Sequence, residues 1–300
     1  MWLAVRYVVV GRSGFAYASP MPAPIDAERI RILLRHEALV HAIPGRVLED
    51  LGDGLLLHDP TDAEPFWNRL EAVRWPSEPA AFDRRLVEVL ARFVSIGRQA
   101  HVWVTPAADA PADLAARLAT NGFEDMGLGH LMAAWVPDLD RAALSAVATP
   151  AQDMIEVRRY GAADSTAATA IAPAIVSTLM AAFGVEEERR VGVTAETLAS
   201  LADPRFTHYL VSRDAAPVAA ARRATFEAIS YLSSIGVVPS ARGLGLGARI
   251  TAIAMTDAID AGSEWLHLGV FADNHVAKRL YERLGFIDAS RPSPDMLLVG

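Results

Sequence analysis

The stretch VVPSARGLGLGARI, residues 237–250, holds three glycines within five residues, and the apolar spacing that follows them is typical of a helix. A glycine-rich turn that leads into a helix presents unpaired backbone N–H groups and the positive end of the helix dipole. Together these features favour a bound phosphate group. The stretch therefore predicts a phosphate-binding turn between a strand and a helix, although three glycines also suit a purely structural tight turn.

Two common phosphate-binding motifs can be compared with this turn. A P-loop ends in Gly-Lys-Ser/Thr, whereas Gly247 is followed by Ala248, so the P-loop is excluded. Gly243, Gly245 and Ala248 do satisfy the dinucleotide pattern G-x-G-x-x-A. That pattern expects its first glycine directly after the strand, but residues 239–242 intervene, and no second half of a Rossmann domain follows. The dinucleotide match is therefore weak.

Composition limits the class of partner. The 300 residues, 52% of them apolar, suffice for one or two domains with substantial cores. A formal net charge of -8 argues against a general nucleic-acid binder, which needs a clustered basic face. The absence of cysteine excludes disulfides and thiolate sites and fits a reducing, cytoplasmic compartment. We expect a small-molecule partner, and neither nucleic acid nor membrane.

The first twenty residues, MWLAVRYVVVGRSGFAYASP, combine an apolar run with a small-residue AYAS segment that resembles a cleavage site. They lack a basic region at the start, and Arg6 interrupts the run, so a signal peptide is disfavoured. The run is also too short to span a membrane. We expect residues 1–25 to form an N-terminal extension, and residues 1–20 to be dispensable for folding and activity.

Metal binding is not expected. The segment HEALVH places His36 and His41 five residues apart, one too many for the zinc motif H-E-x-x-H. Residues five apart lie about 140° apart around a helix, so the two imidazoles would not converge.

Apolar periodicity and breakers in residues 154–300 predict alternating strands and helices. The helix after the glycine turn has Leu246, Ile250 and Ile253 on one stripe and a C-terminal stop at Gly262. The expected elements are a strand near 155, helices 164–183 and 194–201, strands near 209 and 218 and at 229–238, a helix 246–261, a strand 265–271, a helix through 275–285, and strands at 286 and 295–299.

The first half of the chain repeats the layout of the second half. Pro-Ser at 76–77 matches Pro-Ser at 239–240, and Gly-Phe at 122–123 matches Gly-Phe at 285–286, each pair 163 residues apart. The joint falls in an Ala-rich, turn-bounded stretch. We predict an extension (1–25), a first domain (26–140), a linker (141–153) and a second domain (154–300).

The turn VVPSARGLGLG resembles the acetyl-CoA-binding motif of the GCN5-related N-acetyltransferases (GNAT). The motif reads Arg/Gln-x-x-Gly-x-Gly/Ala and is met by Arg242, Gly245 and Gly247. Downstream, NHVAKRLYERLGF is similar to the second motif of that family, with Asn274, Ala277, Tyr281, Gly285 and Phe286 in the expected places. The resemblance covers about residues 154–300.

This resemblance implies an α+β fold of two tandem GNAT-like domains, each a mixed, mostly antiparallel sheet flanked by helices. The central strands near Val237 and Leu268 would splay apart and admit the pantetheine arm of acetyl-CoA. The implied activity is acetyl transfer from acetyl-CoA to a primary amine of a small molecule or a peptide N-terminus, by direct attack in a ternary complex. The protein would be a monomer or a homodimer and would use no metal.

The resemblance also assigns the residues that hold the cofactor. Backbone N–H groups of the glycine turn would surround the pyrophosphate, provided that side chains leave room. The main chain of residues 235–238 would bond the pantetheine amide as an added strand does, and Gly236 suits a local bulge there. The cofactor-binding prediction comprises Ile235, Val237, Val238, Arg242, Gly243, Leu244, Gly245, Leu246, Gly247, Ala248, Asn274, Ala277 and Tyr281.

Two residues are assigned catalytic roles. Tyr281 would protonate the departing coenzyme A thiolate, although an aromatic residue on an apolar helix stripe also suits a core position. Glu227, the only carboxylate close to the splay in the sequence, would be the general base that related enzymes often carry on the strand before the turn. The alternative for Glu227 is an exposed charge at a strand end.

The first unit lacks the chemical residues of the second. At the offset of 163, the motif positions of the second unit fall on Pro79, Phe82, Arg84, Pro111 and Leu118. Phe82 would fill the space that a pyrophosphate needs, so the first unit is interpreted as a degenerate GNAT-like domain. An alternative function for the whole chain is a non-catalytic sensor that binds acyl-CoA.

Overall fold

The computed structural model describes residues 25–42, 45–149 and 155–299, so the N-terminal extension lies largely outside the described residues. We call residues 26–140 the first unit and residues 154–300 the second unit. The first unit contains α1 (Ala27–Ala42), β1 (Val47–Asp50), β2 (Leu55–His58), β3 (Arg69–Glu71), α2 (Pro79–Ser95), β4 (His101–Trp103), α3 (Leu114–Thr120) and β5 (Phe123–Trp135). After α4 (Arg141–Ala148), the second unit contains β6 (Ile155–Tyr160), α5 (Ser165–Phe183), α6 (Arg190–Ala202), β7 (Phe206–Arg213), β8 (Ala216–Phe226), β9 (Ile229–Val237), α7 (Leu246–Asp260), β10 (Trp265–Phe271), α8 (His275–Arg283), β11 (Ile287–Asp288) and β12 (Ser293–Leu298).

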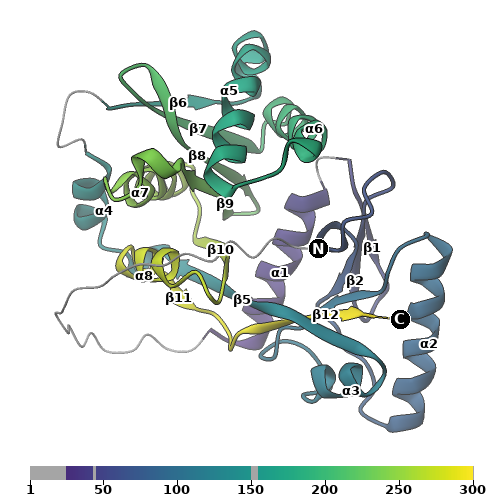
Figure 1. The fold of residues 1–300 in the computed structure, drawn as a ribbon. Helices are drawn as coiled ribbons and strands as arrows, with labels where there is room; N and C mark the ends of the chain where they lie inside the picture. Colours follow the sequence, from purple (N-terminus) through teal and green to yellow (C-terminus); the bar gives the residue numbers. More distant parts are fainter. Residues whose placement is uncertain (1–24, 43–44, 150–154, 300) are drawn as a thin grey trace.

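The strands of both units join into one sheet with the order β1-β2-β3-β4-β12-β5-β10-β9-β8-β7-β6, and β11 pairs with β5 beside this path (Figure 1). Among the described strands, β3 pairs with β4 and β9 with β10 in parallel, and the other pairs are antiparallel. Each unit thus has one parallel pair in a mostly antiparallel sheet, which confirms the predicted mixed α+β fold with two similar units.

The two units exchange strands. The C-terminal strand β12 lies between β4 and β5, so the second unit completes the sheet of the first. In return, the second part of β5, residues 129–135, pairs with β10 and also contacts β11. The long strand β5 therefore runs through both units, and each unit depends on a strand of the other.

Apolar clusters hold the helices on this sheet. In the second unit, α7 and α8 pack over β9 and β10 through a core that includes Ile250, Leu268 and Tyr281. In the first unit, α2 and α3 pack on the sheet around Phe82 and Leu118. Helix α1 lies at the centre of the molecule, where it contacts β1 and β2 of the first unit and β9 of the second (Figure 1).

The expected linker contains a short helix. Asp140 caps α4, because its carboxylate accepts hydrogen bonds from the N–H groups of Ala142 and Ala143 at 3.0 and 2.9 Å. Leu144 of α4 is buried in the same cluster as α7. The other elements of the second unit agree closely with the prediction, except that α6 begins at Arg190 rather than near residue 194.

Candidate active site

The pairing between β9 and β10 ends before the strands do. It runs from Ile229, opposite Trp265, to Tyr231, opposite His267. Residues 232–237 of β9 and 268–271 of β10 have no pairing with each other in this register. The strands are therefore splayed, as predicted, and one edge of β9 faces the opening with backbone groups that a ligand could bond.

A bulge distorts β9 inside this splay. The register with β8 shifts between the pair Ala220–Gly236 and the pair Arg222–Ser233, and Ser234 has a φ of +54°. Steric crowding also requires a glycine at position 236. A Cβ there would lie 2.8 Å from the Cβ of Ala182 in α5, which is too close for two carbon atoms. The bulge predicted at Gly236 is thus present, and its positive φ falls on Ser234.

The glycine turn ends in an open helix N-terminus. Gly243 and Gly245 have φ values of +80° and +74°, a region that side chains other than glycine rarely adopt. The helical hydrogen bonds begin with Arg249 N–H to the carbonyl of Gly245 at 3.0 Å, so the N–H groups of residues 246–248 precede the ladder. A Cβ added at Gly243 or Gly245 would meet no atom of the described residues within 4 Å, which leaves space on this side of the turn within that part of the chain.

Arg242 fastens the turn to neighbouring elements. Its Nη2 donates to the carbonyl of Ala182 at the end of α5 at 2.7 Å, and its Nε donates to the carbonyl of Val237 at 3.2 Å. The guanidinium thus binds carbonyl oxygens on the side of the turn that meets α5 and β9. These contacts give Arg242 a structural role in shaping the turn.

The turn, the end of β9 and α8 meet at one point. A Cβ on Gly247 would lie 3.4 Å from Leu280 Cδ1 and 3.7 Å from Val237 Cγ2. The apolar cluster around Leu246 includes Tyr281 and packs against Ile235, Val237, Val238 and Ala277. Most of the predicted cofactor-binding residues are therefore brought together, and Gly243 and Leu244 lie beside them in the exposed turn.

Tyr281 lies on the inner face of α8, where 7% of its surface is exposed and its ring packs edge-on against Phe286. Burial raises the pKa of the Tyr281 phenol above its ordinary value, so the group is protonated at neutral pH. Asn274 caps α8, because its Oδ1 accepts a hydrogen bond from Ala277 N–H at 3.1 Å. Tyr281 thus carries a proton beside the splayed strands.

Glu227 lies outside this arrangement. It is exposed in the two-residue turn between β8 and β9, where Glu227 and Ala228 have φ values of +52° and +55°. The turn is at the opposite end of β9 from the glycine turn, roughly 30 Å away at the usual rise of a strand. The structure therefore does not bring Glu227 to Tyr281, and its position matches the alternative of an exposed charge at a strand end.

Buried polar residues that sequence reasoning missed lie on the other face of β10. Tyr231 donates to Glu37 Oε1 of α1 at 3.2 Å, and His36 Nδ1 lies 2.9 Å from His267 Nε2. Burial lowers the pKa of His36 to about 4, and it lowers the pKa of His267 as well, so both imidazoles are neutral at pH 7. One signal was available in the sequence, because polar Glu37 continues the buried stripe of α1 that contains Leu33.

A second pair of buried charges lies beside Glu37. Arg69 of β3 is fully buried and bonds Glu71 Oε2 through its Nε at 3.3 Å. Its Nη2 lies 3.9 Å from Glu37 Oε1. Burial raises the pKa of Glu71 to about 7 and also raises the pKa of Glu37.

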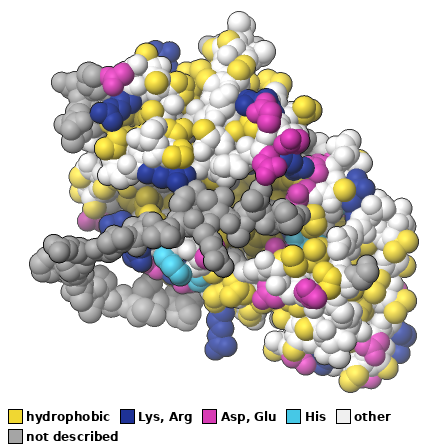
Figure 2. All heavy atoms as spheres, in the orientation of Figure 1, with side chains coloured by type: hydrophobic (Ala, Val, Ile, Leu, Met, Phe, Trp, Pro, Cys, Tyr) yellow, Lys and Arg dark blue, Asp and Glu magenta, His cyan; other side chains and the backbone are white. Residues whose placement is uncertain are grey.

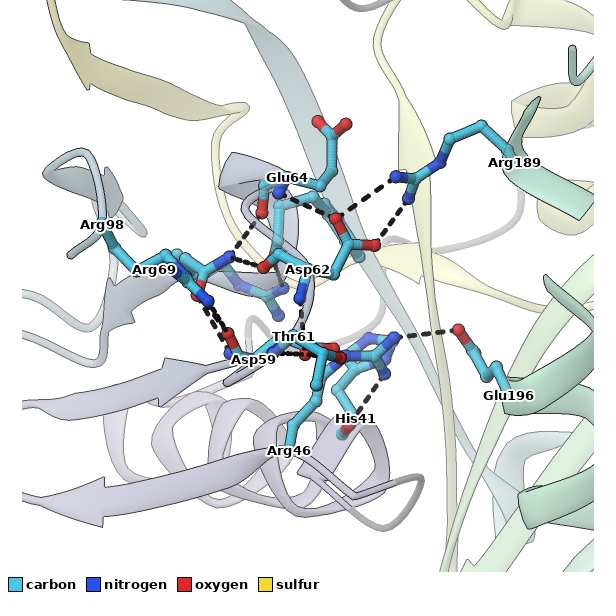
Figure 3. Close-up of polar contacts among 12 residues, drawn as sticks. His41, Arg46, Asp59, Thr61, Asp62, Glu64, Arg69, Arg98, Arg189 and Glu196 are labelled. Carbon is cyan, nitrogen blue, oxygen red and sulfur yellow. Dashed lines mark hydrogen bonds and ion pairs between the residues drawn. The ribbon is translucent and has the colours of Figure 1, made fainter. Parts of the chain in front are cut away.

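Ion pairs join the two units beside this cluster (Figure 3). Glu196 of α6 binds Arg46 of the first unit at 3.0 Å and Arg222 of β8 at 2.8 Å. Burial opposes ionisation of Glu196, but Arg222 and Arg46 outweigh it and lower the pKa of Glu196 to about 2. Arg189 pairs with Asp62 of the first unit at 2.9 Å. Figure 2 shows acidic and basic side chains intermixed where the upper and lower parts of the molecule meet.

The first unit closes the helix end that corresponds to the glycine turn. The carboxylate of Glu78 accepts hydrogen bonds from Ala80 N–H at 3.0 Å and from Ala81 N–H at 2.7 Å, so it caps α2 where α7 is open. Phe82 is buried in the core of the first unit. Leu118, which is fully buried in α3, stands where the second unit has Tyr281.

Two negative findings apply to the described ranges alone. Within them, no group of three or more His, Cys, Asp or Glu side chains is arranged to hold a metal ion. No helix in the same ranges has the length and apolar character that crossing a membrane requires.

Comparison with known sequences identifies the family of the second unit. Residues 173–286 match the Acetyltransferase (GNAT) family. The mycothiol acetyltransferases of Nocardiopsis dassonvillei and Paenarthrobacter aurescens are 43% and 39% identical to this chain over 60 and 66 residues. These matches cover 20% and 22% of this chain and 18% and 20% of the relatives, so the chain spans about a fifth of the length of each relative.

Comparison with solved structures covers the whole chain. A GCN5-related N-acetyltransferase from Kribbella flavida superposes with a TM-score of 0.64 at 22% identity, covering 93% of this chain and 97% of that one. A tandem GNAT protein from the clavulanic acid biosynthesis pathway superposes with a TM-score of 0.60 at 14% identity, covering 91% and 96%. At these identities the likeness shows the fold alone. Most of the second unit therefore matches the GNAT family, and the described part of the chain has the fold of a tandem GNAT protein.

Proposed function

We propose that this protein transfers an acetyl group from acetyl-CoA to a primary amine of a small molecule or a peptide N-terminus. The observation that carries the proposal is the early end of the β9–β10 pairing, directly before an open helix N-terminus. A splayed strand pair accommodates an extended arm that carries amides, and a helix N-terminus accommodates a pyrophosphate. Acetyl-CoA carries both groups on one molecule.

In this proposal the second unit binds the cofactor. The N–H groups of residues 246–248 bond the pyrophosphate, and Gly243 and Gly245 keep the approach clear. The main chain of Ile235 to Val238 bonds the pantetheine arm along the open edge of β9. Capping of α2 by Glu78 makes a second cofactor site in the first unit unfavourable, because its carboxylate already occupies the N–H groups and repels a phosphate.

The chemical step needs a proton donor for the leaving group. The neutral amine attacks the thioester carbonyl carbon, a C–N bond forms and the C–S bond breaks. Tyr281 donates its phenolic proton to the departing thiolate, and the proton that the nitrogen loses as it becomes an amide restores the phenol. A protonated acceptor must first lose another proton, and the exposed Glu227 is not placed to accept it.

Acceptor profiling tests the proposed function. The full chain is incubated with acetyl-CoA and a panel of primary amines, including amino acids, polyamines, amino sugars and peptides, while free thiol is followed. We expect thiol release that depends on the amine, with the acetylated amine found by mass spectrometry. Tight binding of acetyl-CoA without acetylation of any amine would instead support the alternative of a non-catalytic sensor.

A further inference from the structure

A small, partly enclosed cavity lies where the two units meet, at the mouth of the splay. Its volume is about 10 Å³, which is room for one group of the size of a water molecule. Its lining includes Glu37 of α1, Glu71 of β3, Thr105, Gly269 of β10 and Ser293 of β12. The first unit supplies both carboxylates, and the second unit supplies the strand that borders the splay.

The cavity borders the expected position of the thioester. Gly269 is two residues beyond His267, the last residue of β10 that pairs with β9. A Cβ on Gly269 would lie 3.8 Å from the hydroxyl of Tyr231, the last paired residue of β9. Along β10, Leu268 and Val270 belong to the cluster of Tyr281, so Gly269 faces the opposite side of the sheet. A thioester held between the strands would thus have Tyr281 on one side and this cavity on the other.

The lining of the cavity has unused hydrogen-bonding capacity. Glu71 Oε1 and Ser293 Oγ are buried without a hydrogen-bond partner in the described part of the chain, and the two residues are 2% and 1% exposed. Buried polar atoms are normally paired, so these two indicate a ligand or a water in the cavity. An ammonium group has the size of the cavity and supplies three donors to such acceptors.

The charge of the lining favours a cation. Glu37 and Glu71 face one guanidinium, that of Arg69. Glu37 Oε1 also lies 3.4 Å from Nε2 of His41, but burial lowers the pKa of that imidazole, so one negative charge is uncompensated when both carboxylates are ionised. The further titratable groups near Glu71 are His101 of β4 and Asp109, and burial raises the pKa of Asp109 to about 7. His130 of β5, which pairs with Asp288 at 3.1 Å, also lines the cavity. A bound ammonium would balance the excess charge.

We propose that this cavity holds the ammonium group of the acceptor and that Glu71 takes its proton. This inference rests on the proposed function. The step transfers one proton from R–NH3+ to the Glu71 carboxylate and leaves the neutral amine that attacks the thioester; Glu71 later releases the proton to solvent. Because the cavity has room for one small group, it admits a primary amine and excludes its N-methyl analogue. The first unit, which lacks cofactor chemistry, thus supplies the acceptor site.

The substitution Gly269→Ala tests this proposal, because it adds a methyl group to the lining of the cavity. The added Cβ would lie 3.8 Å from the hydroxyl of Tyr231, which is an ordinary contact distance. For an amine found by profiling, we expect KM for the amine to rise at least about tenfold and KM for acetyl-CoA to stay within about twofold. Ser293→Ala, which removes an unpartnered hydroxyl, should raise KM for the amine with an unchanged melting temperature. The matched control is Gly192→Ala in α6, where an added Cβ meets nothing within 4 Å. An unchanged KM for the amine in both cavity variants would overturn the proposal.

A binding measurement separates this proposal from the proposed function. Methylammonium chloride should raise the melting temperature of the wild-type protein more than equal potassium chloride does, and Gly269→Ala should abolish the difference. Equal effects of the two salts on the wild type would refute the cavity site, whether or not any amine is acetylated. A methylammonium effect that Gly269→Ala abolishes, in a protein that acetylates no amine, would support the cation site and refute the acetyltransferase.

Discussion

Tyr231 of the second unit donates a hydrogen bond of 3.2 Å to Glu37 of the first unit. Tyr231 is also the residue at which the pairing of β9 with β10 ends. The first unit therefore holds the residue that defines the mouth of the splay. This contact gives the first unit a structural role. The first unit has the fold of the second but has no counterpart of the glycine turn or of Tyr281.

The first prediction concerns the pyrophosphate. Gly245→Asp should weaken acetyl-CoA binding at least about tenfold in titration calorimetry, because it adds a negative charge beside the open N-terminus of α7 and strains a residue with φ of +74°.

Gly262→Asp is the matched control, since Gly262 also has a positive φ, +86°, and follows the C-terminal end of the same helix. It should cost stability but leave the affinity unchanged. Equal affinities in folded Gly245→Asp and wild type would contradict the assignment of the turn.

The second prediction concerns the proton donor. Tyr281→Phe keeps the buried ring and removes the hydroxyl, so acetyl-CoA affinity and melting temperature should barely change. The single-turnover rate of acetyl transfer should fall by roughly a hundredfold or more, the usual scale for general acid catalysis. Single-turnover conditions are used because slow product release could otherwise hide a change in the rate of the chemical step. A wild-type rate in this variant would leave Tyr281 as a core residue only.

The third prediction concerns the ion pairs between the units. Glu196→Gln should lower the free energy of unfolding at pH 7 by about 3 kcal/mol or more, because it leaves Arg46 and Arg222 without their shared carboxylate. Urea denaturation measures this loss. The exposed pair of Glu187 with Arg190 supplies the control Glu187→Gln, which should leave the free energy of unfolding nearly unchanged.

The same carboxylate predicts a pH dependence. The pKa of Glu196 is lowered from 4.5 to about 2 in the folded state. The ionised carboxylate therefore stabilises the fold fully above pH 4.5, the pKa in the unfolded chain, and this stabilisation is lost as pH falls from 4.5 to about 2. The stability difference between the wild type and Glu196→Gln should therefore shrink as pH falls from about 5 towards 2. A difference that does not change over this range would show that Glu196 does not carry the interaction.

The fourth prediction concerns the exchanged strands. A fragment that ends at residue 149 lacks β12, and a fragment that begins at residue 150 lacks β5, so each exposes an unpaired sheet edge. Expressed alone, both should be insoluble or lack a cooperative thermal transition, whereas co-expression should yield a soluble complex. A stable, monomeric second fragment would show that the units fold independently.

Sequence patterns predicted the helices, strands and turns that depend on residues close together in the chain. Gly243 and Gly245 of the turn are required by their positive φ values, and the apolar stripe of α7 and the alternation of β10 can be read from a few residues. The capping role of Asn274 follows from its place before α8 in the same way.

The features that sequence missed depend on distant segments. The exchange of β5 and β12 joins residues far apart in the chain, and the burial of Arg69 between Glu37 and Glu71 depends on the pairing of β3 with its neighbours and on α1. Glu227 was misplaced for a different reason. The turn Glu227-Ala228 has two positive φ values but no glycine or asparagine, so the sequence does not mark it as a tight turn.

A structure of the full chain with bound acetyl-CoA tests the central claim most directly. The account predicts one cofactor per chain, with its pyrophosphate at the N–H groups of residues 246–248, its arm between β9 and β10, and its thioester beside Gly269. Density at the N-terminus of α2, next to Glu78 and Phe82, or a cofactor that does not enter the splay, would contradict it.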